Sequence, residues 1–276
     1  MAKNIHGPLY YERMGRTGPV IAFVHPNPMD QSCWIFQMAH LSTWYRCIAI
    51  DIPGYGRSPK AGPDLTVADM AQACWEAIDD ALPGATAILV GCSVGSAIVP
   101  YMYHQRPDKT AALVLSGTGY NPTKEFAKRR IDAYTANGID YRWAYTFEDL
   151  SPAFRATPLA HFFANLFTER NQFADVQTIL YQFKALQKPD PDGHHERIAC
   201  PTIILTGSED GTHQSAFALK TRIPNCELKV LPGAGHACQM EQPWLFDRFM
   251  IEFLAKHGLF PAVSKPTMGG KNRSES

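Results

Sequence analysis

A serine at position 93 has the neighbours of an enzymatic nucleophile. The apolar run 87–90 leads into the pattern Gly-x-Ser-x-Gly, formed by Gly91, Ser93 and Gly95, and a helical period follows. A serine at the tip of such a sharp strand-to-helix turn needs glycine two residues before and two residues after it, because side chains there would collide with the turn. The pattern therefore predicts that Ser93 attacks a carbonyl carbon in an acyl-transfer reaction.

Two other interpretations of this turn stay open. Ser93 could instead cap the helix that follows, which is a common role of serine. Cys92 could be the nucleophile, but the residues two positions before and after it are Val90 and Val94, so the required glycines are missing. We interpret Cys92 as a packed thiol beside the site.

A base and an acid that could activate this serine follow two later apolar runs. Serine is a poor nucleophile at neutral pH, so it needs an imidazole base and a carboxylate that fixes the imidazole tautomer. Asp210 and His236 each stand in a loop after a predicted strand, as Ser93 does. These three side chains are expected to meet at one edge of a parallel sheet. Glu209, next to Asp210, stays open as the alternative acid.

The order of apolar and helical segments predicts an α/β fold with a mostly parallel central sheet and helices on both faces. Short apolar runs, each of about the length of a buried strand, alternate with helical periods. The predicted strands are 20–24, 47–50, 86–90, 111–115, 202–205 and 228–231. The predicted helices of this core are 31–42, 66–82, 94–105, 213–222 and 243–257.

The strand pattern stops between 120 and 197, and helical periods replace it, most clearly at 124–137 and 174–187. A structureless loop of that length is uncommon in a compact domain. We expect these helices to cover the carboxyl ends of the strands, where open α/β sheets bind ligands. The chain is thus divided into a core at 1–119, a helical cap at 120–197, the rest of the core at 198–261, and a disordered tail at 262–276.

The composition argues against several classes of protein. The 276 residues carry 26 Lys and Arg against 26 Asp and Glu, so the basic footprint of a nucleic-acid or membrane-surface protein is missing. The seven cysteines include no C-x-x-C pair, which argues against a disulfide framework and a cysteine zinc site. We expect a cytoplasmic protein with reduced thiols, no metal and no transmembrane span. The expected partner is a small-molecule substrate, and a homodimer is compatible with the sequence.

Several short patterns together resemble the α/β-hydrolase fold superfamily, in its branch with a helical cap. They are H-x-N-P at 25–28, D-x-P-G-x-G-x-S at 51–58, the serine pattern at 91–95, G-x-x-D at 207–210 and G-x-G-H-x-x-x-x-E-x-P at 233–243. The resemblance implies a serine hydrolase that needs no cofactor. It also implies that Ser93 is the nucleophile, His236 the general base and then acid, and Asp210 the orienting acid.

The resemblance further implies an oxyanion hole made by the backbone N–H groups of Asn27 and Val94. The family usually has His-Gly where this chain has His25-Pro26. Proline lacks an N–H group and stiffens the turn, but the implied donor, Asn27, keeps its own N–H. The segment 51–58 is expected to shape a loop beside the site.

The serine at this turn also narrows the reaction. The dehalogenase and epoxide hydrolase branches use an aspartate there, and the carbon–carbon bond hydrolases typically show a G-N-S-x-G-G turn that this chain lacks. We predict hydrolysis of a carboxylic ester or lactone through an acyl-enzyme. The alternatives are a carbon–carbon bond hydrolase of a ring-cleavage diketone, a non-catalytic ligand-binding receptor and a cofactor-free oxygenase.

The predicted cap is rich in aromatic rings, which favours a pocket for apolar or aromatic acyl or alkoxy groups. No pair of arginines stands out near the strand ends, so a small charged substrate is disfavoured. The candidate pocket residues are His25, Trp34, Cys92, Tyr120, Trp143, Phe147 and Phe163.

Overall fold

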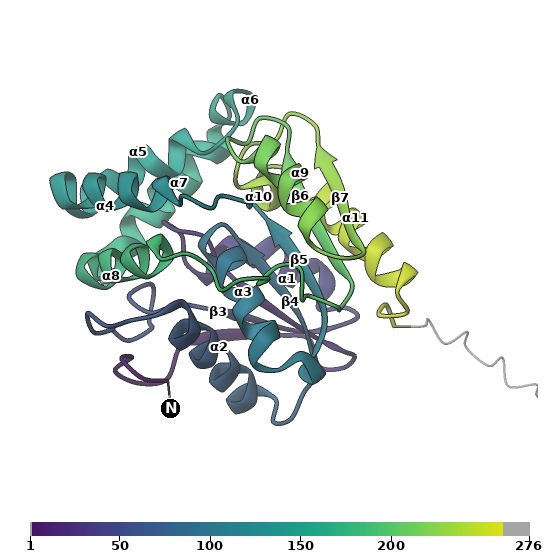
Figure 1. The fold of residues 1–276 in the computed structure, drawn as a ribbon. Helices are drawn as coiled ribbons and strands as arrows, with labels where there is room; N and C mark the ends of the chain where they lie inside the picture. Colours follow the sequence, from purple (N-terminus) through teal and green to yellow (C-terminus); the bar gives the residue numbers. More distant parts are fainter. Residues whose placement is uncertain (1, 262–276) are drawn as a thin grey trace, which may run out of the picture.

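A seven-stranded sheet runs through the middle of the molecule (Figure 1). The computed structural model describes residues 2–261, so the tail predicted at 262–276 lies outside the described residues. The strand order is β1-β3-β2-β4-β5-β6-β7, and every neighbouring pair is parallel except β1 and β3. The strands are β1 (Tyr11–Met14), β2 (Val20–Val24), β3 (Arg46–Ile50), β4 (Ala87–Cys92), β5 (Thr110–Ser116), β6 (Thr202–Gly207) and β7 (Cys226–Leu231).

The central strands are the apolar runs that the sequence predicts. β2 and β4 are buried at every residue, because helices cover both faces of the sheet. β1 is different: it is a half-exposed edge strand that pairs with β3 in the antiparallel direction, with Tyr11 opposite Ile50. Its sequence has no apolar run, so the strand was not predicted.

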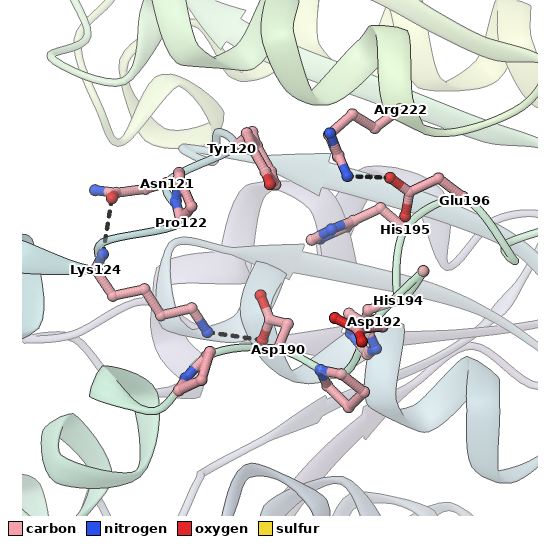
Figure 2. A pocket seen from close by; sticks show the side chains of 13 residues that line it. Tyr120, Asn121, Pro122, Lys124, Asp190, Asp192, His194, His195, Glu196 and Arg222 are labelled. Carbon is pink, nitrogen blue, oxygen red and sulfur yellow. Dashed lines mark hydrogen bonds and ion pairs between the residues drawn. The ribbon is translucent and has the colours of Figure 1, made fainter.

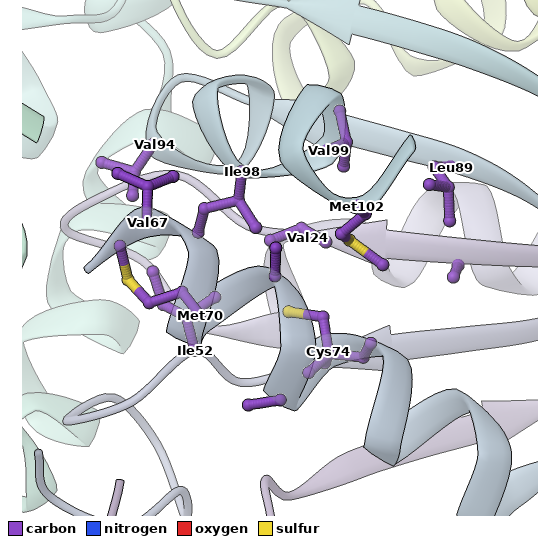
Figure 3. Close-up of a cluster of buried hydrophobic side chains, with 14 of the residues drawn as sticks. Val24, Ile52, Val67, Met70, Cys74, Leu89, Val94, Ile98, Val99 and Met102 are labelled. Carbon is purple, nitrogen blue, oxygen red and sulfur yellow. The ribbon is translucent and has the colours of Figure 1, made fainter. Parts of the chain in front are cut away.

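Helices on the two faces of the sheet build two separate cores. Figure 3 shows part of the first, where Met70 and Ile98 pack with Val24 and Leu89 of the sheet. In the second core, Trp34 and Phe246 pack on the opposite face. The core helices are α1 (Ile35–Leu41), α2 (Val67–Ala81), α3 (Val94–Gln105), α9 (His213–Arg222), α10 (Cys238–Glu241) and α11 (Pro243–Lys256), with the 3-10 helices η1 (Gln31–Trp34) and η2 (Pro107–Lys109).

The chain between β5 and β6 is helical, and Figure 1 shows these helices grouped at the upper left. We call this part the α4–α8 segment. It comprises α4 (Glu125–Asn137), α5 (Tyr141–Glu148), α6 (Pro152–Arg155), α7 (Pro158–Arg170) and α8 (Val176–Gln187), with the 3-10 helices η3 (Gly138–Asp140) and η4 (Asn171–Phe173).

Hydrogen bonds tie the α4–α8 segment to the loops at the carboxyl ends of the strands. Beyond β3, the N–H of Asp175 donates to the carbonyl of Gly54 at 2.9 Å, and the N–H of Ala61 donates to the Thr178 hydroxyl at 3.1 Å. Beyond β7, the N–H of His236 donates to the carbonyl of Asp149 at 2.8 Å. The segment therefore lies at the sheet edge where ligands bind in open α/β folds.

Candidate active site

Ser93 sits in a strained turn between β4 and α3. Its φ of 52° and ψ of −111° belong to a region that residues other than glycine rarely adopt, and such strain gathers at functional sites. Its N–H donates to the carbonyl of Ser116 at 2.9 Å, and the Ser96 hydroxyl donates to the carbonyl of Ser93 at 2.6 Å. Ser93 occupies the N-cap position of α3, but its side chain makes no capping hydrogen bond. The turn leaves the hydroxyl free for another role.

Both glycines of the serine pattern are required by close backbone contacts. A Cβ atom on Gly91 would lie 2.4 Å from the carbonyl oxygen of Gly95. A Cβ atom on Gly95 would lie 2.1 Å from the carbonyl oxygen of Val24, at the end of β2. These distances are far below van der Waals contact, so only glycine permits the turn to pack against β2.

Asp210 and His236 form a direct pair in the loops after β6 and β7. His236 Nδ1 lies 2.9 Å from Asp210 Oδ1, and the Asp210 carboxylate also accepts the N–H and hydroxyl of Thr212 at 2.8 and 2.7 Å. Burial alone would raise the pKa of Asp210, but the charge and hydrogen bond of His236 and the two hydrogen bonds of Thr212 hold it below its ordinary value. The neighbouring Glu209 is exposed and makes no bond to the imidazole. The ionised Asp210 therefore fixes the imidazole with Nε2 free.

The pKa of His236 is set by opposing influences. Burial lowers it, but the charge and hydrogen bond of Asp210, together with the charge of Asp149, raise it to about 9. Arg130 acts in the lowering direction. The imidazole is thus a strong base that is neutral only toward alkaline pH.

One cavity of about 520 Å³ is lined by Ser93, Asp210 and His236. It lies between the carboxyl ends of the central strands and the α4–α8 segment. Within residues 2–261, no hydrogen bond connects the Ser93 hydroxyl to the His236 imidazole. Hydrogen bonds between catalytic groups are often long in unliganded enzymes and shorten when substrate binds, so this geometry is compatible with a nucleophile and its base.

The walls of this cavity are mixed in character. Leu115 and Leu219 from the core and Phe126 and Leu186 from the α4–α8 segment give an apolar side. Charged side chains make up much of the remainder: Lys124, Arg129, Arg130, Glu148, Asp149, Asp190 and Glu209. The aromatic content of the α4–α8 segment predicts a more apolar wall than this.

None of the seven candidate pocket residues lines the cavity that holds Ser93. His25 is fully buried and holds two loops together, with Nδ1 2.9 Å from the carbonyl of Pro26 and Nε2 accepting the N–H of Ile52 at 3.0 Å. Trp34 packs between Phe23 and Phe246 in the second core. Cys92 is also buried, and burial raises the pKa of its thiol well above the ordinary value, so it is a packed thiol.

The four remaining candidates are aromatic residues that also lie outside this cavity. Trp143 stacks on Phe147 with ring centres 5.0 Å apart, and Phe163 meets Phe36 of α1 at 6.0 Å. Tyr120 lies under the guanidinium of Arg222 and lines a smaller pocket of about 190 Å³, which Figure 2 shows.

The smaller pocket is polar and adjoins the larger cavity. The ion pair of Lys124 and Asp190, at 2.7 Å, belongs to the walls of both, as do His194 and His195 (Figure 2). Burial lowers the pKa of His194 to about 3, so this imidazole is neutral. Among the described residues, no group of three or more histidine, cysteine or acidic side chains is placed to hold a metal ion.

The two predicted oxyanion donors lie near the Ser93 turn. Val94 lines the cavity. Gly95 packs directly against the backbone carbonyls of Val24 and His25, and Asn27 follows two residues after His25. In the described part of the chain, the backbone N–H groups of Asn27 and Val94 donate no hydrogen bond. Both donors are therefore free for a ligand, and their role stays a prediction.

Three residues around His236 were missed by the sequence reasoning. Gly117 has a φ of +53°, and a Cβ there would come within 3.0 Å of the imidazole Cε1. Glu241 accepts the N–H groups of Gly235 at 3.0 Å and Ser151 at 3.2 Å, and so ties the histidine loop to the α4–α8 segment. The place of Glu241 in the G-x-G-H-x-x-x-x-E-x-P pattern could have pointed to it. The third residue is Asp149, whose carbonyl accepts the N–H of His236 and whose charge raises the pKa of His236, and nothing in the sequence points to it.

The sequence profile of the alpha/beta hydrolase family matches residues 21–246. The chain belongs to this family. The resemblance inferred from the short patterns is thereby confirmed, and with it a hydrolase as the class of enzyme.

Two curated relatives illustrate the range of the family. The chain is 26% identical over 258 residues to the dihydrolipoyllysine-residue acetyltransferase component of the acetoin cleaving system of Pseudomonas putida. That match covers 90% of this chain and 66% of the relative, so the chain spans slightly less than two thirds of that protein. It is 25% identical over 253 residues to a putative carbamate hydrolase, RutD, of Escherichia coli O26:H11, covering 86% of this chain and 91% of RutD.

Solved structures show the same fold. An esterase from Thermogutta terrifontis, solved with malate bound, superposes with a TM-score of 0.78 at 24% identity, over 92% of this chain and 97% of the esterase. An enol-lactonase from Burkholderia xenovorans LB400 superposes with a TM-score of 0.79 at 19% identity, over 91% and 98% of the two chains. The predicted α/β-hydrolase fold is confirmed. No described helix of the protein is long and apolar enough to cross a membrane.

Proposed function

We propose that the protein is a serine hydrolase that cleaves a carboxylic ester or a lactone through Ser93, His236 and Asp210. One observation carries this proposal. Ser93, on its strained turn, lines the same cavity as His236, and the Nδ1 of His236 is held by the ionised Asp210. This is the arrangement of nucleophile, base and orienting acid that acyl transfer requires.

The proposed reaction has two halves. In the first, Nε2 of His236 takes the proton of the Ser93 hydroxyl while the oxygen attacks the substrate carbonyl carbon. The protonated imidazole then gives this proton to the departing alcohol oxygen, which leaves an ester of Ser93 and the acyl group. In the second half His236 takes a proton from a water molecule as the water attacks the acyl carbon, and then gives a proton to the Ser93 oxygen as its bond to the acyl group breaks, which releases the acid. General base catalysis of this kind contributes roughly 10²- to 10⁴-fold.

The negative charge that develops on the carbonyl oxygen needs donors that are already in place. The free N–H groups of Asn27 and Val94 are the proposed donors, and removal of one such donor typically costs about 2.7–4 kcal/mol. The tight contact of Gly95 with the end of β2 supports this role, because it fixes the loop of Asn27 against the turn of Ser93.

We propose that the segment 120–197 acts as the cap of this site. It contributes Phe126, Tyr145 and Asp149 to the cavity and is tied to the histidine loop through Glu241. An apolar or aromatic acyl or alkoxy group would pack against Leu115 and Phe126. The seven cysteines are all free, which suits a small-molecule hydrolase of the reducing cytoplasm.

The proposal is tested by hydrolysis assays with the wild type and Ser93→Ala. The substrates are p-nitrophenyl esters with short and aromatic acyl groups, a panel of lactones and a ring-fission diketone. We expect ester or lactone cleavage with kcat lowered by roughly 10⁴-fold or more in the variant. Turnover that survives the substitution undiminished would reject the serine mechanism, and activity on the diketone alone would favour the carbon–carbon bond hydrolases.

A further inference from the structure

Two buried polar side chains near the cavity have hydrogen-bond donors without acceptors in the described part of the chain. Arg142, on α5, is 2% exposed, and within residues 2–261 none of its guanidinium nitrogens donates a hydrogen bond or joins an ion pair. Asn27 is 1% exposed, and its amide Nδ2 likewise lacks an acceptor in this part of the chain. A buried charge without a counter-charge is strongly destabilising, and a buried donor without an acceptor is also costly.

These two donors belong to one cluster beside the cavity. The guanidinium carbon of Arg142 lies 5.2 Å from the ring centre of Tyr55, and the Tyr55 hydroxyl donates to Asn27 Oδ1. The Tyr134 hydroxyl donates to the same oxygen at 2.9 Å. The acceptor side of the Asn27 amide is therefore fully used, and the amide is held with its Nδ2 donor turned away from both hydroxyls.

Tyr145 connects this cluster to the cavity of Ser93. Tyr145 lines the cavity, and its hydroxyl lies close to the Asn27 side chain, whose influence lowers the pKa of Tyr145 against the much larger raising effect of burial. Arg142 precedes Tyr145 by one helical turn of α5. Arg142 and Asn27 do not themselves line the cavity, so Tyr145 is the residue through which their cluster meets it.

Within the described part of the chain, no carboxylate forms an ion pair with Arg142. The carboxylate of Asp30 acts on its charge from a distance, but Asp30 is already bound by Arg170 and Ser32. Burial raises the pKa of Tyr55 and Tyr134, so both hydroxyls stay neutral.

Arg130, a second arginine of the α4–α8 segment, differs from Arg142 in having an ion-pair partner. Arg130 lies 3.2 Å above the ring centre of Tyr145, and its guanidinium pairs with Asp149 at 3.5 Å. Among the described residues Arg130 thus has a carboxylate partner, and Arg142 does not.

We propose that Arg142 and the side-chain amide of Asn27 bind a carboxylate group of the substrate at the Tyr145 end of the cavity. A carboxylate fits the planar fork of guanidinium donors and has lone pairs left for Nδ2. This inference rests on the proposed function, because the backbone N–H of the same Asn27 is the proposed oxyanion donor. We assign the carboxylate to the acyl part, a few carbon atoms from the carbonyl that Ser93 attacks, which differs from the expectation from the sequence that a small charged substrate is disfavoured.

The first test compares charged and neutral substrates of similar length. The ratio of kcat/KM for mono-p-nitrophenyl glutarate to that for p-nitrophenyl hexanoate is measured in the wild type, Arg142→Gln and Arg155→Gln. Arg155, on α6, is the matched control, since it also has a buried unpaired Nε but lies outside this cluster and the cavity. We expect the wild type to favour the glutarate ester, and the ratio to fall about 10- to 100-fold in Arg142→Gln alone. A wild type without this preference, or a ratio unchanged in Arg142→Gln, would overturn the proposal.

The second test needs no hydrolysis, so it separates this inference from the proposed function. Glutarate should raise the Tm of the wild type and of Arg155→Gln but not that of Arg142→Gln. If neither ester is cleaved, the glutarate shift still decides whether the carboxylate site exists. If esters are cleaved through Ser93 and glutarate shifts nothing, the site is disproved while the serine mechanism stands.

A third measurement checks that the charge is unpaired. Without ligand, Arg142→Met should raise the Tm, because it replaces an uncompensated buried charge by an apolar chain of similar length. A lower Tm for this variant would show that the fold already compensates Arg142 and would overturn the proposal.

Discussion

The two walls of the cavity are built in different ways. On the core side, Ser93, Asp210 and His236 stand in short loops directly after strands, and each loop is fixed by backbone contacts to the sheet or to its neighbours. On the other side, the α4–α8 segment presents Arg130, Tyr145 and other side chains from helices that are tied to the core mainly through loops. The comparison favours a division in which the sheet positions the proposed catalytic groups and the helices line the space proposed for the substrate.

The largest effect is expected from the acid of the core wall. In Asp210→Asn the amide cannot stabilise the protonated imidazole and favours the wrong tautomer, so kcat should fall by about 10⁴-fold with little change in stability. The measurement is steady-state hydrolysis of the best p-nitrophenyl ester, with unfolding by urea as the check on the fold.

Glu209→Gln is the matched control for this variant. Glu209 is exposed and makes no bond to His236, so kcat should change only slightly. A large loss of kcat in Glu209→Gln together with a small loss in Asp210→Asn would show that Glu209, and not Asp210, is the orienting acid.

The next effect concerns stability and tests how tightly the Ser93 turn is packed. The Cβ of Gly95→Ala would lie 2.1 Å from the carbonyl oxygen of Val24, and backbone cannot move aside as a side chain can. We expect the free energy of unfolding in urea to fall by about 3 kcal/mol. In the control, Gly211→Ala, the new Cβ meets nothing within 4 Å, so stability should be unchanged or slightly higher. Equal stability of the two variants would mean that the turn is not under close packing.

The difference between the two walls also explains what the sequence could predict. β2 and α3 begin and end where the apolar and helical patterns predict, because strands buried on both faces and amphipathic helices leave clear periods. Ser93, Asp210 and His236 could be chosen because glycine patterns mark the turns that bring them to the sheet edge. Short local sequence patterns were therefore enough to predict the candidate catalytic residues of the core side of the cavity.

The residues of the α4–α8 side of the cavity could not be predicted from local sequence patterns. Phe163 and Trp34 have the composition of pocket residues, yet they pack helices together, since an aromatic ring serves a core as well as a pocket. Asp149 reaches the cavity, and Arg142 reaches Tyr55, only through the way α5 packs on the core, which no motif records. β1 was missed for a related reason: an exposed edge strand shows no apolar run.

The smallest effect is a shift in the pH dependence, and it tests whether the helical wall acts on the core chemistry. His236 must be neutral to accept a proton, so kcat/KM should rise with pH through the pKa of this group, which is about 9. The negative charge of Asp149 raises that pKa, so Asp149→Asn should lower it and move the acidic limb of the profile to lower pH. Glu148→Gln, a change of the neighbouring exposed carboxylate on the same cavity wall, should leave the limb in place. An unshifted limb in Asp149→Asn, or a shift to higher pH, would mean that the two walls do not interact electrostatically and that the helices act through shape and contact alone.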